Sequence, residues 1–168
     1  MKNIHLIVAT DQYNGIARDN TIPWYIKDDL RYFQKVTSKA SDGFRNAVIM
    51  GRVTYNTLNR KPLKNRWNIV LTSQPNDFPE IDAFSNLQEA IDFCEHQDTI
   101  ESIFIIGGER VYREALENYS MNTIYRTLIK DVYHCDRFLP ELTGYQCLSK
   151  MDASSDGYNY SFEIWKRN

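Results

Sequence analysis

The sequence predicts an α/β fold, with a central, mostly parallel mixed sheet, an antiparallel C-terminal edge and about four flanking helices. In the first two-thirds of the chain, short apolar runs alternate with segments whose apolar residues recur at helical spacing. Such alternation is typical of crossover connections, which build a parallel sheet with helices on both faces. From Met121 onward, strand-like runs follow one another without helices between them, which predicts the antiparallel edge.

The expected elements of the first two-thirds are short strands that each lead into a loop or a helix. Turn-forming residues at 11–15 end the first strand, and Pro23 prevents the first helix from starting earlier. In chain order, we expect strands at 4–10, 47–50, 67–71 and 102–106. The first expected helix ends near 38 and the second starts near 54. Two further helices are expected at 87–96 and 109–117.

The last third is expected to add strands at 122–133, 145–150 and 158–166, with a turn at 156–157. No repeat, low-complexity tract or linker divides the 168 residues. A chain of this length can bury a core without a disulfide or a metal. We therefore expect one domain over residues 1–168.

The composition excludes several classes of function. A net charge of −2 without a basic block argues against a nucleic-acid partner. No stretch approaches the ~20 apolar residues that cross a membrane, and residues 1–10 have the pattern of a strand rather than of a signal peptide. Cys94, Cys135 and Cys147 are widely spaced and odd in number, which favours free thiols in the cytoplasm. No second cluster joins His134 and Cys135 at ligand spacing, so no metal site is expected.

Asp29 places a carboxylate inside the apolar face of the first predicted helix. Ile26, Leu30 and Phe33 recur at three- and four-residue steps, and Asp29 falls within this stripe, whereas Asp28 falls outside it. An ionised carboxylate carried toward an interior raises its pKa or meets a polar ligand. The alternative is an acid that caps the first turn and favours the helix dipole. Asp29 is therefore a candidate catalytic or ligand-anchoring acid.

Two predicted strands end in glycine-containing turns that lead into helices, at 51–54 and at 107–108. Free amides at a helix N-terminus attract phosphate, and glycine lets a ligand approach the backbone closely. Two such turns suggest a ligand with more than one phosphate, such as NADP, although either alone is also compatible with a simple turn. Residues 72–74 close a third strand with two hydroxyls and an amide, which are groups that could bond a 2′-phosphate.

Arg66, at the start of the third strand, could hold a substrate carboxylate with two hydrogen bonds, with a solvated surface charge as the alternative. The chain shows no nucleophile-and-base set of a hydrolase, and it has only three histidines. Hydride transfer needs no such set, because the cofactor supplies the reactive atom.

These motifs resemble those of the dihydrofolate reductase family, and the resemblance covers essentially the whole chain. It rests on six pieces in register: 15–17 with 22–24, 29–33, 48–54, Arg66 before 69–71, 106–108 with 111–112, and 136–140. The resemblance implies a dihydrofolate reductase-like fold. It also implies NADPH-dependent reduction of 7,8-dihydrofolate to 5,6,7,8-tetrahydrofolate, in support of one-carbon metabolism, and binding of antifolates.

Within this resemblance, Asp29 matches the family's active-site acid, which bonds the pterin's amino-pyrimidine edge and promotes protonation of N5 by way of water near Trp24. Thr127 is expected to support the acid, and Arg66 to grip the glutamate α-carboxylate. The implied catalytic residues are Asp29, Trp24, Thr127 and Tyr112. The implied substrate-binding residues are Ile7, Val8, Asp29, Leu30, Phe33, Leu58, Lys61, Arg66 and Ile106.

The resemblance also implies a cofactor site that is covered by a mobile loop from Asn14 to Ile22. Ala9 and Ile16 would meet the nicotinamide carboxamide, and the Gly107–Gly108 peptide bond would be cis. The implied cofactor-binding residues are Ala9, Gly15, Ile16, Ala17, Asn20, Thr21, Gly51, Arg52, Val53, Thr54, Thr72, Ser73, Gln74, Ile106, Gly107, Gly108, Glu109, Arg110, Val111 and Tyr112.

Several positions depart from common family forms. Ala17 stands where glycine is frequent, which would stiffen the loop. Val53 replaces a residue that is often polar, so phosphate binding would depend more on Arg52. Glu109 brings a negative charge near the expected pyrophosphate unless it points outward. Asn65 replaces a usual turn glycine and is expected to adopt a left-handed conformation.

Two other functions stay open. A related pyrimidinone reductase of riboflavin synthesis shares this sort of fold and cofactor but would not require Asp29 and Arg66 in folate register. A non-catalytic nucleotide-binding protein could use the same scaffold, since fold alone does not fix function. The intact acid, arginine and glycine set argues against it. We expect a monomer with small-molecule ligands.

Overall fold

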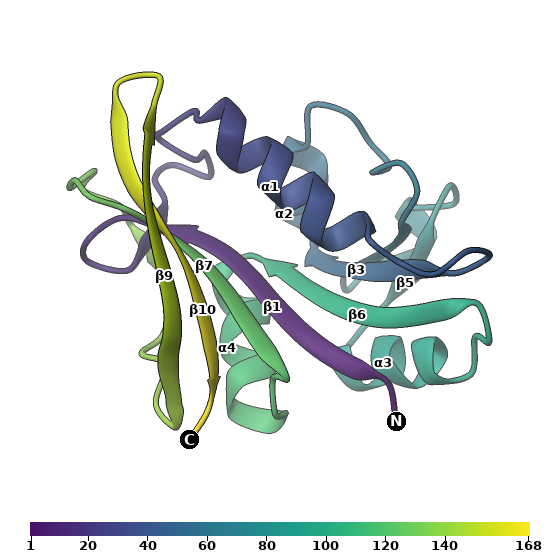
Figure 1. Cartoon of the computed structure of the whole chain (residues 1–168). Helices are drawn as coiled ribbons and strands as arrows, with labels where there is room; N and C mark the ends of the chain where they lie inside the picture. Colours follow the sequence, from purple (N-terminus) through teal and green to yellow (C-terminus); the bar gives the residue numbers. More distant parts are fainter.

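The computed structural model describes residues 1–168 and places an eight-stranded twisted sheet at the centre of the molecule (Figure 1). The strands are β1 (Asn3–Thr10), β3 (Arg45–Gly51), β4 (Trp67–Leu71), β5 (Asp82–Phe84), β6 (Ile100–Gly107), β7 (Thr123–Ile129), β9 (Tyr145–Ser155) and β10 (Tyr158–Arg167). Their order is β5-β4-β3-β6-β1-β7-β10-β9. The pairs from β5 to β7 are parallel, and β10 pairs antiparallel with both β7 and β9. The predicted fold class is confirmed.

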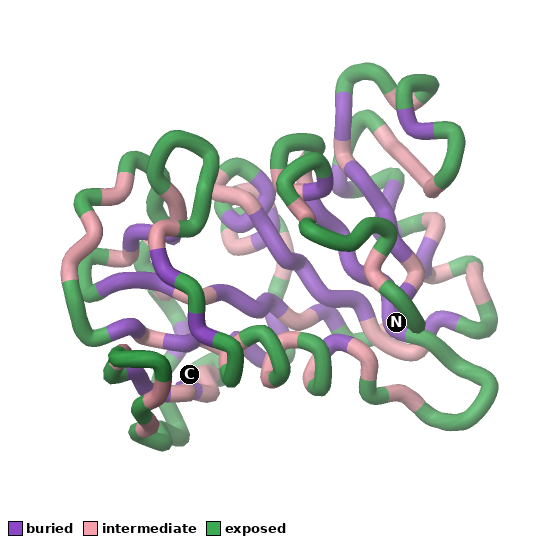
Figure 2. Tube along the Cα trace, turned by 90° about the horizontal axis from the view of Figure 1, so that it is seen from above, coloured by how far each residue is buried: buried purple, intermediate pink, exposed green.

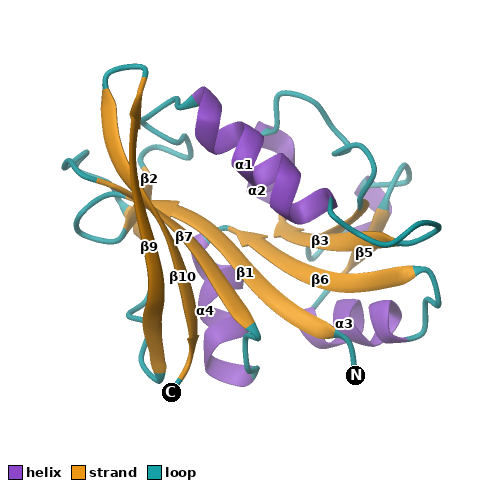
Figure 3. Cartoon of the chain, viewed as in Figure 1, coloured by secondary structure: helices purple, strands orange, loops and turns teal.

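Helices cover both faces of the sheet, as the alternation of strands and helices predicted (Figure 3). Helices α1 (Lys27–Ser38) and α2 (Arg52–Thr57) lie on one face, and α3 (Leu87–Glu95) and α4 (Glu109–Asn118) lie on the other. A short 3₁₀ turn, η1 (Pro75–Asp77), follows β4.

The two faces of the sheet have separate apolar cores, because alternate residues of each strand point to opposite sides. Along β1, Leu6 and Val8 pack with α3 and α4, whereas Ile7 packs toward α1 and α2. Figure 2 shows that the buried residues gather along the central strands, while the helices are exposed on their outer sides. The sheet is therefore a rigid platform whose strand ends can position side chains.

Several element boundaries differ from the prediction. Helix α2 begins at Arg52, two residues before the expected start, because Gly51 keeps an extended backbone and acts as the N-cap. Strand β9 continues to Ser155, since an exposed edge strand needs no alternating apolar pattern. Strand β7 ends at Ile129, where Asp131 turns back to bond the Ile129 carbonyl.

A second sheet of two short strands was not predicted. Strand β2 (Gly15–Ala17) pairs antiparallel with β8 (Arg137–Phe138) and lies within the expected mobile loop. The buried carboxylate of Asp11 accepts hydrogen bonds from the amides of Tyr13 (2.9 Å), Gly15 (2.8 Å) and Tyr133 (3.1 Å). One side chain thus joins the start of β2 to the segment that leads into β8.

Gly15 is packed so closely that any side chain there should destabilise the protein. A Cβ atom at this position would lie 2.5 Å from the Cβ of Cys135 and 2.9 Å from Oδ1 of Asp11. We expect Gly15→Ala to lower the free energy of unfolding by about 1–3 kcal/mol, which urea denaturation would measure. Adding Cys135→Gly removes the closest contact and should restore part of the loss. A Gly15→Ala protein as stable as the wild type would contradict this packing.

Candidate active site

The carboxylate of Asp29 is partly buried between α1 and the sheet. The hydroxyl of Thr127, on β7, donates a hydrogen bond of 2.7 Å to Oδ1 of Asp29. Burial raises the pKa of Asp29 above its ordinary value of 3.8, and the Thr127 bond opposes this effect because it stabilises the charged form. Asp29 does lie in the first turn of α1, where a negative charge favours the helix dipole, but its side chain makes no capping bond, so the capping part of the alternative is wrong.

Three aromatic or apolar residues that are close to Asp29 in the sequence differ in how they are packed. The Tyr32 ring packs against Phe162 with centroids 4.3 Å apart, and burial is the main reason that the pKa of Tyr32 rises to about 12. Trp24 is buried and packs edge-on against Tyr133 at 5.3 Å. Leu30 belongs to the predicted apolar stripe but is 50% exposed, so the protein covers only about half of its surface.

Arg66 is held at the other end of α1. Its guanidinium is buried, and it donates from Nη1 to the hydroxyl of Thr37 (3.1 Å) and from Nε to the carbonyl of Lys64 (2.8 Å). The guanidinium carbon lies 6.0 Å from the centre of the Phe33 ring. The surface-charge alternative for Arg66 is therefore wrong.

One face of α1 thus carries an acid near one end and supports a cation near the other. Thr37 lies two helical turns beyond Asp29, a separation of about 12 Å along the axis at the helical rise, with Phe33 between them. This geometry suits an elongated ligand with a hydrogen-bonding ring at one end and a carboxylate at the other.

The two glycine turns lie side by side, because β3 and β6 are neighbours and Met50 pairs with Gly107. A Cβ on Gly108 would lie 3.5 Å from the Thr54 hydroxyl, and one on Gly51 would lie 3.5 Å from Val111. The Gly107–Gly108 bond is cis, and Asn65 has φ 62°, as the resemblance and the sequence had predicted. The sheet therefore brings both turns to one edge.

Both helices that follow these turns have glycine as N-cap, and neither N-cap provides a side-chain acceptor. The first-turn amides of α4 are consequently free of side-chain capping, as an anion site requires. Glu109 does not compete for these amides. Its carboxylate accepts from the Phe138 amide at 2.7 Å and lies 3.7 Å from Arg137, so it is directed toward β8.

Residues 72–74, which follow β4, lie at the same edge of the sheet because β4 pairs with β3. Thr72 is buried and accepts a hydrogen bond from the Gln74 amide at 3.1 Å, whereas Ser73 and Gln74 are exposed. Tyr112 is buried below the glycine turn, where burial raises its pKa, and its hydroxyl donates to the Ile7 carbonyl at 2.8 Å.

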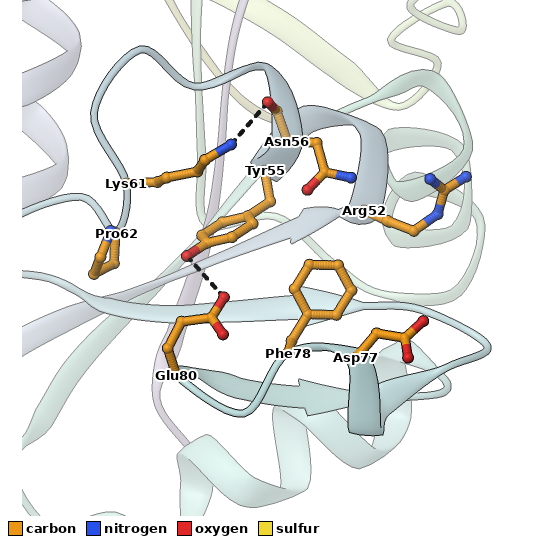
Figure 4. A pocket seen from close by; sticks show the side chains of 8 residues that line it. All are labelled: Arg52, Tyr55, Asn56, Lys61, Pro62, Asp77, Phe78 and Glu80. Carbon is orange, nitrogen blue, oxygen red and sulfur yellow. Dashed lines mark hydrogen bonds between the residues drawn. The ribbon is translucent and has the colours of Figure 1, made fainter.

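A cavity of about 530 Å³ lies between α2 and the segment around η1, and it does not include Asp29 (Figure 4). Lys61 lies here with Arg52, rather than with Arg66. Its ammonium donates to the Asn56 carbonyl at 3.0 Å and lies 5.8 Å from the centre of the Tyr55 ring. The full lining is Arg52, Tyr55, Asn56, Lys61, Pro62, Asp77, Phe78 and Glu80.

The remaining predicted site residues fall into two groups. Ile7, Val8, Ile16, Ile106 and Val111 are buried in or against the sheet. Those more exposed are Ala9, Ala17, Asn20, Thr21, Val53, Leu58 and Arg110. Sequence reasoning missed Thr37 as the partner of Arg66. The signal was its position on the same helix face as Asp29.

Fold and site together define an α/β protein with a partly buried acid on α1 and two neighbouring glycine turns at one edge of its sheet. The family model for dihydrofolate reductase matches residues 3–167. A dihydrofolate reductase of Aedes albopictus is 37% identical, over 99% of this chain and 98% of its own. Those of Schistosoma mansoni and Bacillus subtilis are each 34% identical, over 96% and 98% of this chain and 95% and 94% of theirs.

The chain belongs to the dihydrofolate reductase family, which is a family of oxidoreductases. None of its helices is both long and apolar enough to cross a membrane.

The raised pKa of Asp29 makes the stability of the fold depend on pH. Because the native pKa lies above the unfolded value, the stabilising effect of protonation is complete below about pH 3.8 and is lost as the pH rises through the native pKa. We expect Asp29→Asn to lose this dependence and to be more stable than the wild type at pH 7, as measured by urea denaturation across pH. Asp28→Asn, at an exposed pair with Arg31, is the control and should change stability by less than about 0.5 kcal/mol. Equal pH profiles for wild type and Asp29→Asn would contradict the burial of this charge.

Proposed function

We propose that this protein reduces 7,8-dihydrofolate to 5,6,7,8-tetrahydrofolate with NADPH as the hydride donor. The proposal rests on the position of two charged groups along one face of α1. Asp29 belongs to this face near its start, and Arg66 bonds to Thr37 near its end. A folate has a hydrogen-bonding pterin at one end and a glutamate carboxylate at the other, and this face offers a complementary group for each. Family membership supports the same reaction.

In this proposal, Asp29 bonds the amino-pyrimidine edge of the pterin and promotes protonation of N5 through water near Trp24. Burial favours the protonated carboxyl, which is the form that can supply a proton. Thr127 fixes the orientation of the carboxyl by its hydrogen bond. Arg66 uses Nη2, which its protein hydrogen bonds do not engage, toward the glutamate carboxylate.

Apolar side chains would define the path of the substrate between these ends. The half-exposed Leu30 has the character of a cleft residue, since an exposed apolar side chain can be covered by an apolar ligand. The ligand-lining set that we propose is Ile7, Val8, Leu30, Phe33, Leu58 and Ile106.

The donor set at the glycine edge fits a dinucleotide with several phosphates. Gly51, Gly107 and Gly108 leave the backbone open, and the uncapped first turn of α4 presents amides to an anion. Residues proposed to hold the phosphates are Arg52, Thr54, Thr72, Ser73, Gln74 and Arg110. When bound, NADPH supplies the hydride, and the protein supplies position and electrostatics.

The nicotinamide end is proposed to lie near Ala9 and Ile16 and beneath residues 14–22. This segment would act as a lid that excludes water from the reacting atoms. The buried Tyr112 would keep the edge of β1 in place through its bond to Ile7.

We also propose that residues 1–168 form one catalytic domain, that it acts as a monomer in the cytoplasm, and that antifolates bind the substrate cleft. The three unpaired cysteines support a reducing compartment. The unbroken sheet from β5 to β9 supports a single domain.

The deciding experiment is the loss of NADPH absorbance on addition of dihydrofolate, with NADH and methotrexate as controls. We expect rapid oxidation of NADPH that methotrexate blocks. Binding of NADPH without turnover of dihydrofolate would overturn the proposal and favour a different substrate, such as a pyrimidinone, or a binding role.

Asp29→Asn should remove the proton-supplying carboxyl while keeping the fold. We expect kcat/KM for dihydrofolate at neutral pH to fall by about 10²–10⁴, the usual scale for losing a general acid-base group. Steady-state kinetics would measure this loss, and Asp28→Asn provides the matched control. Unchanged activity in Asp29→Asn would exclude the proposed role.

Arg66→Leu should weaken folate binding and spare NADPH. Losing a charge-assisted pair to a carboxylate should raise Kd for dihydrofolate by about tenfold or more. Fluorescence titration with each ligand separately would test this, and Thr37→Val, which removes only one bond that holds Arg66, should have a smaller effect. An equal loss of affinity for both ligands would count against the assignment.

A further inference from the structure

Arg126 is a charged residue that points into the side of the sheet opposite Asp29. Its side chain is only 12% exposed, and burial lowers its pKa while Glu163 opposes that effect. The guanidinium lies 3.8 Å from Oε1 of Glu163, on β10, and 6.0 Å from the centre of the Trp165 ring. Glu163 is itself buried. The ammonium of Lys150, which is exposed, lies 3.4 Å from the other carboxylate oxygen of Glu163, Oε2.

The other nitrogens of Arg126 reach the base of the segment from Asn14 to Ile22, called the lid here. Nη2 donates to the side-chain oxygen of Asn14 at 2.8 Å, and Nε donates to the Thr10 hydroxyl at 3.1 Å. Asn14 has φ 63°, and its carbonyl accepts from the Leu139 amide at 2.8 Å. Arg126 therefore connects the first lid residue to β1 and β10.

A buried ion pair is a costly way to stabilise a sheet, because apolar residues of similar volume often do as well or better. Unlike an apolar residue, Arg126 of this pair can donate a hydrogen bond from a charged group to the Asn14 side chain. A hydrogen bond to a charged group is stronger than a neutral one and has a defined direction.

We propose that Arg126 is a positioning residue that holds the lid in place through Asn14, with Glu163 as its fixed counter-charge. Breaking the Arg126 bond releases the side chain of Asn14, so that the first lid residue is held only by its backbone bonds to Asp11 and Leu139. The lid then opens more often. The effect on NADPH rests on the proposed function, whereas the bond and its effect on lid opening do not.

The experiment compares Arg126→Met, Asn14→Gly and their double variant with the wild type in the full chain. Glycine accepts the positive φ of residue 14, so Asn14→Gly removes the side-chain bond without backbone strain. Lys150→Met is the matched control, because it removes a cation from the same Glu163 but does not contact the lid.

Two readouts are used. The first is the rate of tryptic cleavage after the exposed Arg18, within the lid, measured by mass spectrometry without any ligand. The second is the dissociation rate of NADPH, measured by stopped-flow fluorescence, together with separate KM values for NADPH and dihydrofolate. Urea denaturation of each variant separates lid opening from global unfolding.

We expect both single variants to accelerate cleavage and NADPH release by about tenfold, the scale of one charge-assisted hydrogen bond. KM for NADPH should rise more than KM for dihydrofolate, and Lys150→Met should match the wild type. The double variant should match Arg126→Met, because both changes remove the same bond.

Three results would overturn the proposal: cleavage unchanged in both single variants, fully additive effects in the double variant, or equal acceleration in Lys150→Met. Additivity would mean that glycine acts by its own flexibility. A wild type that does not oxidise NADPH with dihydrofolate would instead refute the proposed function, and the cleavage rates would still test the role of Arg126.

Discussion

The arrangement of this molecule depends on one constraint: parallel strands end at the same edge of their sheet. The C-terminal ends of β4, β3, β6 and β1 lie next to one another because these four strands are consecutive in the sheet. Each end leads into a polar or glycine-containing turn, so groups that are far apart in sequence meet along a single line. The backbone hydrogen bonds of the sheet fix this line, and the side chains of the site do not have to organise it.

Helix α1 lies against the sheet together with two charges, the partly buried Asp29 and the buried Arg66. Asp29 is met by a neutral hydroxyl, Thr127, whereas Arg66 is met by a hydroxyl and a carbonyl. Neither charge is neutralised by an opposite charge in these contacts. Both groups therefore keep electrostatic capacity for a ligand, and the protein carries the desolvation cost in its free state.

The sequence was sufficient for the elements with strong local patterns. The strand 67–71 and the helix that ends at Ser38 match the prediction, and the stripe around Asp29 located the buried acid. Strands β2, β5 and β8 were missed because two or three residues carry no periodicity. The contact of Arg66 with Thr37 and that of Arg126 with Asn14 depend on tertiary packing, which spacing along the chain does not encode.

Strand β9 forms one open edge of the sheet, and its exposed positions combine charged residues with two apolar ones, Leu148 and Met151. Lys150 and Asp152 each pair with a charge of the same molecule, Glu163 and Lys130. Another strand that approached this edge could contact Leu148 and Met151, but it would have to remove water from charges that are already paired. The charges therefore oppose the sheet-to-sheet association that begins aggregation, at an edge where two exposed apolar side chains would otherwise favour it.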